Sequence, residues 1–132
     1  GVTPILTQPG WINGLTRFSD KAVAGIFDGT KHFVGAGWSS PVSLGAWHHT
    51  VAAFDFSRRT ISIYVDGRRR ETKEITPPVA RQGRSTWYIG GYPGHGGLSQ
   101  VTIDDLCVYD RLLSPDEIRF LADSANLPVA SE

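Results

Sequence analysis

The chain has 132 residues, 40% of them hydrophobic, which suits one sizeable core and is too little for two independent ones. Thirteen basic side chains balance thirteen acidic ones, so the net charge gives no reason to expect nucleic acid as a partner. No apolar run approaches the roughly 18 residues of a membrane span, so we expect no membrane insertion. One domain is therefore predicted over residues 1–125, followed by a tail or linker over residues 126–132.

Short apolar stretches of strand length recur along the chain, and most are separated by clusters of Gly, Pro, Asn, Asp or Ser. They cover residues 3–8, 22–27, 31–38, 47–56, 60–67, 85–92 and 102–109. Fifteen glycines, eight prolines and 11% aromatic residues suit strands joined by tight turns. The pattern is typical of an all-β sandwich.

Residues 60–75 carry the clearest strand signal. Apolar side chains at Ile61, Ile63 and Val65 alternate with less apolar ones, which is the period of a half-buried strand. Asp66-Gly67 supplies the residue types that accept positive φ in a tight turn. We predict a β-hairpin here.

The stretch LSPDEIRFLADS, residues 113–124, predicts a short helix. Ser114 is a suitable N-cap, Pro115 suits the first helical position, and Glu117 stands where a capping-box glutamate would. Leu113 is placed to pack onto Ile118. The apolar stripe is narrow, so we expect the helix to lie on the sandwich.

The glycine-rich stretch GGYPGHGG, residues 90–97, is a candidate ligand-binding loop. It lacks the Lys-Ser/Thr pair of a phosphate-binding P-loop, and no helical pattern follows it. We interpret it as a loop between strands that presents Tyr92 and His95 to a ligand.

The four tryptophans fall into two groups. Trp47 and Trp87 lie in strand patterns and are predicted to be core residues. Trp38 and Trp11 are flanked by turn residues, where an indole ring is placed to stack on the apolar face of a sugar.

Arginines cluster in and after the hairpin turn, and they allow two interpretations. Charges on a strand edge commonly discourage aggregation. Arg68 and Arg70 are also candidates for binding an acidic glycan, because the guanidinium group matches carboxylate and sulfate oxygens.

Other chemistry has little support in the sequence. His48 and His49 are adjacent, and a strand would direct them to opposite faces, away from a shared metal. Cys107, the single cysteine, excludes an internal disulfide, and its apolar strand pattern predicts an inert residue. No Gly-x-Ser-x-Gly nucleophile motif occurs.

Three motifs in order resemble a known family. LGAWHHTVAAFDFSRRTISIYVDGRRR, then YIGG at residues 88–91, then IDDLCVYDRLLSPDEI at residues 103–118 resemble the signature of bacterial laminin-G-like domains of the concanavalin A-like lectin/glucanase superfamily. The resemblance spans about residues 45–121, and residues 3–10 look like an earlier strand of the same pattern.

The resemblance implies a two-sheet antiparallel jelly-roll sandwich from a secreted or cell-surface protein, which often binds carbohydrate and often holds a structural calcium ion. Family members usually begin with further strands before the one that resembles residues 3–8. The chain is then a fragment, a chain completed by a partner, or a reduced version with an exposed edge. The family's aromatic and glycine are replaced before Ile103, but the resemblance implies Asp104 as a calcium ligand.

Asp104 and Asp105 also raise the question of catalysis. A strand over residues 102–109 would place them on opposite faces, so they do not form a pair. Retaining glucanases of the same superfamily carry a Glu-x-Asp-x-Glu triplet, which this sequence lacks. We therefore predict that the domain is not an enzyme.

Two functions remain open at this point. The first is a non-catalytic carbohydrate-binding or adhesion module that recognises a polysaccharide or glycoconjugate at the cell surface. The second is a structural or interaction domain, completed by strands from a partner chain or from the rest of a larger polypeptide.

Overall fold

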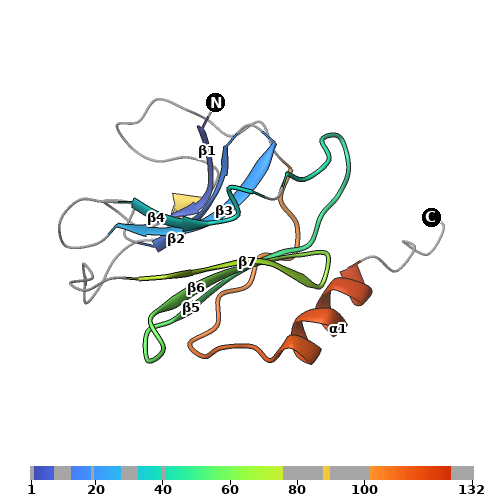
Figure 1. Cartoon of the computed structure of the whole chain (residues 1–132). Helices are drawn as coiled ribbons and strands as arrows, with labels where there is room; N and C mark the ends of the chain where they lie inside the picture. The colour runs from blue at the N-terminus through green and yellow to red at the C-terminus, as the bar shows by residue number, and fades with distance from the viewer. Residues whose placement is uncertain are drawn as a thin grey trace.

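The computed structural model describes residues 2–7, 13–18, 20–27, 33–39, 41–75, 88–89 and 102–125. Within these ranges the chain forms eight strands in two antiparallel sheets and one helix (Figure 1). The predicted residues Trp11, Trp87, Tyr92 and His95 and the predicted tail lie outside these ranges.

The larger sheet has five strands in the order β4-β3-β2-β1-β8. Their bounds are β1 Val2–Thr7, β2 Asn13–Phe18, β3 Lys21–Phe27, β4 Phe33–Ala36 and β8 Tyr88–Ile89. Strands β1 to β4 form a meander in which each strand pairs with the next. The sequence pattern missed β2, because it begins with the turn residues Asn13 and Gly14 and lacks apolar alternation.

The smaller sheet has three strands in the order β5-β6-β7, with bounds Thr50–Asp55, Thr60–Val65 and Arg68–Glu74. The predicted hairpin is confirmed. Asp66 and Gly67 form its turn with φ of 52° and 83°, and the alternating residues of β6 are buried, namely Ile61, Ile63 and Val65.

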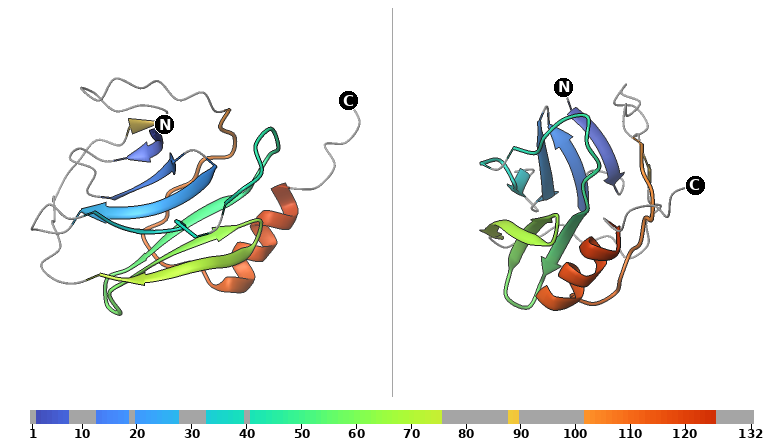
Figure 2. Two further views of the ribbon diagram at one scale, coloured as in Figure 1. Left: turned by 45° about the horizontal axis from the view of Figure 1, so that its top comes forward. Right: turned by 90° about the vertical axis from the view of Figure 1, so that its right-hand side faces the viewer.

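The two sheets form a sandwich, as Figure 2 shows, and the predicted all-β fold is confirmed. Its core contains buried side chains of β2, β3 and β4 from the larger sheet and of β6 from the smaller one, namely Leu15, Ala24, Ile26, Ala36, Ile61, Ile63 and Val65. Burying a side chain of isoleucine size contributes roughly 1.5–3 kcal/mol, so this interface is a main source of stability. Over the described ranges, no helix is long and apolar enough to cross a membrane.

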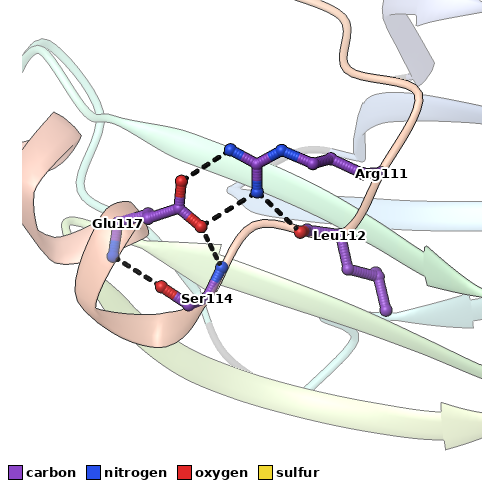
Figure 3. Close-up of polar contacts among 4 residues, drawn as sticks. All are labelled: Arg111, Leu112, Ser114 and Glu117. Atoms are coloured by element: carbon purple, nitrogen blue, oxygen red, sulfur yellow. Dashed lines mark hydrogen bonds and ion pairs between the residues drawn. The ribbon is translucent and has the colours of Figure 1, made fainter.

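Helix α1, Pro115–Ala125, confirms the predicted helix and its cap. The Ser114 N–H donates to Glu117 Oε1 at 2.9 Å, and the Glu117 N–H donates to Ser114 Oγ at 3.1 Å (Figure 3). Ile118 and Ala122 are buried. The helix lies against the β6–β7 turn, since a Cβ on Gly67 would be 3.3 Å from Ala122 Cβ.

Two strand predictions are wrong. Residues 102–110 form no strand, and Asp105 has a φ of 52°, which interrupts the extended alternation on which the face assignment of Asp104 and Asp105 depended. Cys107 is exposed, contrary to the prediction of an apolar mid-strand residue. Trp47 precedes β5 and is 64% exposed, so its prediction as a core residue is also wrong.

Candidate functional site at the β4 and β7 edge

Trp38 lies on a turn directly after β4, the edge strand of the larger sheet. Its side chain is 40% exposed, as the sequence predicted for a ligand-facing tryptophan. The preceding residue, Gly37, has a φ of 121°, and a Cβ there would lie 2.1 Å from the backbone oxygen of Ala22. Only glycine fits this close approach, so the position of Trp38 depends on Gly37.

Glu71 of β7 connects this turn to the smaller sheet. Its carboxylate accepts a hydrogen bond from the Gly37 N–H. Burial alone would raise the pKa of Glu71, but hydrogen bonds from the Gly37 and Ser39 backbone and from Lys73 outweigh burial and lower the pKa. An ionised carboxylate therefore holds the turn of Trp38 against β7.

Arg68 and Arg70 also lie on β7, where both are exposed. The hydrogen bond between Gly37 and Glu71 joins the turn after β4 to β7. Trp38 immediately follows Gly37, and Arg70 immediately precedes Glu71, so both residues are adjacent in the sequence to this hydrogen bond. This hydrogen bond places the turn that carries Trp38 beside the segment of β7 that carries Arg70. Tyr92 and His95 lie outside the described residues, so their place relative to this edge stays a prediction.

His48 and Asp66 form a second polar cluster near the start of β7. His48 Nδ1 lies 2.8 Å from Asp66 Oδ2, and the His49 N–H donates to Asp66 Oδ1 at 3.0 Å. Burial alone would raise the pKa of Asp66, but these hydrogen bonds outweigh it and lower the pKa. The hydrogen bond to Asp66 in turn raises the pKa of His48, against partial burial and the positive charge of Arg70.

Ser43 completes an arrangement that superficially resembles a hydrolytic triad. His48 Nε2 lies 2.9 Å from Ser43 Oγ, but it also lies 2.9 Å from the Ser43 carbonyl oxygen. A carbonyl oxygen only accepts, so this geometry requires a protonated Nε2 that donates. The raised pKa of His48 favours that charged form, which cannot take a proton from Ser43. We interpret the cluster as a structural connection between the loop before β5 and the β6–β7 turn.

The loop before β5 exposes two large apolar side chains that the sequence did not predict as site residues. Leu44 is 65% exposed and Trp47 is 64% exposed. The Gly45-Ala46 pair between them marks a turn, which was the available signal that Trp47 precedes the strand.

Asp104 was predicted as a calcium ligand from the resemblance alone. It is exposed, and its Oδ1 accepts the N–H of Asp105 at 2.9 Å. In the part of the chain that the structure describes, no group of three or more His, Cys, Asp or Glu side chains is placed to hold a metal ion. The calcium site stays a prediction.

A comparison with protein families matches residues 12–119 to a laminin G model, described as the concanavalin A-like lectin/glucanases superfamily. The chain belongs to this superfamily. The match covers most of the chain and agrees with the two-sheet architecture, so the predicted laminin-G-like resemblance is confirmed.

A comparison with solved structures finds a similar chain in an S-layer domain-containing protein, residues 221–444, from Clostridium thermocellum. The two chains are 25% identical with a TM-score of 0.50. The match covers 92% of this laminin-G-like chain and 63% of the clostridial one. No curated protein matches the sequence.

Proposed function

We propose that this laminin-G-like domain is a non-catalytic carbohydrate-binding or adhesion module of a secreted or cell-surface protein. The observation that carries the proposal is the exposed indole of Trp38 on a turn held by Gly37 and Glu71. A pre-positioned aromatic ring loses little entropy when it stacks on a sugar.

Arg68 and Arg70 define the class of glycan that this edge suits. Both are exposed on β7, and the carboxylate of Glu71 is already bonded to Gly37 and Lys73. The two guanidinium groups therefore favour an acidic polysaccharide or glycoconjugate, and binding is expected to weaken as salt is raised.

Location at the cell surface is supported by the S-layer domain-containing neighbour. The non-catalytic part of the proposal rests on the sequence, which lacks the Glu-x-Asp-x-Glu triplet of retaining glucanases. Glycan hydrolysis that disappears in Asp104→Asn or Asp105→Asn would contradict it.

A glycan array probed in calcium buffer and again with chelator tests ligand and ion together. For a glycan that binds, Trp38→Ala is expected to raise the Kd about tenfold, the equivalent of about 1.4 kcal/mol. Phe120→Ala is the matched control, because Phe120 is a 70% exposed aromatic residue on α1. Equal losses in the two variants, or no binding to any acidic glycan, would contradict the proposed site.

A second candidate function is favoured by a different observation. Four large apolar side chains are exposed within seven residues before α1, namely Leu106, Val108, Tyr109 and Leu112. Such a patch is typical of a surface that another polypeptide covers. We therefore also propose a structural or interaction domain of a larger assembly, tested by whether the chain co-elutes with another cell-surface polypeptide.

A further inference from the structure

The two edges of the three-stranded sheet differ in their protection against pairing. β7 carries three arginines, a lysine and two glutamates, and its register with β6 shifts between Ile63 and Tyr64. Charges and bulges of this kind keep an edge from pairing with another strand. β5, at the opposite edge, reads TVAAFD and pairs with β6 without any shift. β5 is therefore a regular edge with few of these safeguards.

The outer side of β5 leaves the core incompletely covered. Among the described strands, β5 pairs only with β6, so its outward backbone groups need water or another strand. All six residues of β5 are half-buried, whereas β6 alternates with fully buried positions. Ala52 and Phe54 pack against the core from this edge, and Phe54 stacks on Phe56, which is 48% exposed.

The apolar segment before α1 lies on the side of the molecule away from β4 and β7. The right-hand view of Figure 2 shows it descending in orange toward α1, opposite β7. Its exposed apolar residues and the half-buried strand β5 are independent signs that the described residues leave this side of the sandwich incompletely covered.

We propose that the outer edge of β5 binds an extended polypeptide strand from outside residues 1–132, which adds a strand to the three-stranded sheet. This inference deepens the second candidate function and rests on it. β5 offers six residues, or roughly 20 Å at about 3.3 Å per residue. The added strand carries apolar side chains at alternate positions, which cover Ala52 and Phe54 on the core face.

The similar solved structure indicates where such a strand would come from. This chain covers 63% of that chain, so the neighbour contains polypeptide without a counterpart in residues 1–132. A polypeptide segment of that kind is the occupant we assign to the β5 edge. A second copy of this chain, paired through β5, is the competing occupant.

Hydrogen–deuterium exchange of the 132-residue chain tests the proposal. The probe is a synthetic peptide of about ten residues that alternates valine and threonine between terminal lysines, added at about 1 mM. We expect exchange in β5 to slow at least tenfold, with β7 unchanged as the internal control. The same peptide, N-methylated at every residue, keeps the side chains but loses the backbone donors of both edges, and it is expected to have no effect.

Three other outcomes would each contradict one part of the proposal. Unchanged exchange in β5, or equal slowing by the N-methylated peptide, excludes backbone pairing at this edge. Slow exchange in β5 without peptide, in a chain that sediments as a dimer, assigns the edge to a second copy. Co-elution with a cell-surface polypeptide while β5 exchange stays fast retains the assembly function and removes β5 as its site.

Discussion

His48 and Asp66 lie 18 residues apart in the sequence and form an ion pair with 2.8 Å between Nδ1 and Oδ2. The pair joins the loop before β5 to the β6–β7 turn, and the backbone reinforces it, because the Asp66 N–H donates to the His49 carbonyl oxygen at 2.7 Å. The same turn contacts α1 through Gly67. The ion pair therefore lies where the loop, the hairpin and the helix meet.

His48→Gln is expected to destabilise the domain more at pH 5.5 than at pH 9. The folded-state pKa of His48 is raised above its ordinary value of 6.5, so its contribution is present below pH 6.5 and is lost as pH rises through the raised pKa. Asp66 has a lowered pKa and contributes above its ordinary value of 3.8. Both side chains are partly exposed, so we expect a loss of about 1 kcal/mol or less.

Urea unfolding at each pH measures this loss. Asp66→Asn is the matched control, because asparagine accepts the positive φ of this position but lacks the charge and one of the two acceptor oxygens. The double variant should lose less than the sum of the single variants at pH 5.5 and be additive at pH 9. Additivity at both values would show that the pair does not stabilise the fold.

His49→Gln is expected to show the opposite pH dependence. Burial lowers the pKa of His49, against the attraction of Asp66, and its Nδ1 is buried without a hydrogen-bond partner in the described structure. A base with a lowered pKa stays neutral in the fold, so it disfavours folding as pH falls below its ordinary value of 6.5. The stability of His49→Gln relative to the unmodified chain should therefore rise from pH 8 to pH 5. Parallel slopes for the His48 and His49 variants would contradict the two assignments.

Local patterns predicted the elements whose signals depend on neighbouring residues. The hairpin around Asp66-Gly67 and the helix cap formed by Ser114 and Glu117 were both identified correctly, because turn chemistry and capping act within four residues. The contacts between elements that lie far apart in the sequence could not be predicted from such local patterns. The Glu71 to Gly37 hydrogen bond joins residues 34 positions apart, and no spacing rule indicates it.

The wrong predictions share one physical cause, which is that an apolar pattern does not specify whether a neighbour covers it. Residues 102–109 alternate like a strand, but a strand requires hydrogen-bonding partners, and Asp105 adopts positive φ. Trp47 was assigned to the core by its neighbours in the sequence, whereas β5 begins at Thr50. At the candidate site, the exposure of Trp38 was predicted from its flanking turn residues, and its connection to β7 was not.

Gly37→Ala is expected to destabilise the domain by about 3 kcal/mol or more, because the new Cβ would lie 2.1 Å from the backbone oxygen of Ala22 at a φ of 121°. Gly45→Ala is the matched control. Gly45 also has positive φ, at 74°, but no atom lies within 4 Å of the added Cβ, so we expect a loss of about 1 kcal/mol. Thermal unfolding of both variants gives the comparison, and similar losses would contradict the close approach of β4 and β3.

Glu117→Gln is expected to loosen the first turn of α1 in a pH-dependent way. Glu117 accepts hydrogen bonds from Arg111 Nη1 at 3.0 Å and Nη2 at 2.7 Å, as Figure 3 shows. The hydrogen bonds from Arg111, with that from the Ser114 N–H, lower the pKa of Glu117 to about 2. Its contribution is therefore complete above the ordinary value of 4.5 and is lost as pH falls through about 2.

Amide exchange over residues 116–118 measures the effect, and it should be faster in Glu117→Gln than in the unmodified chain at pH 6. Ser114→Ala removes the other half of the capping box. It should lower the free energy of unfolding by about 1 kcal/mol, both at pH 6 and at lower pH. Asp116→Asn is the control, because Asp116 is a first-turn acid whose side chain is 92% exposed and lies 3.3 Å from Arg119. Equal acceleration of amide exchange by Asp116→Asn and Glu117→Gln would show that negative charge in the first turn causes the effect in general, and that the bidentate contact of Glu117 with Arg111 does not stabilise the start of the helix.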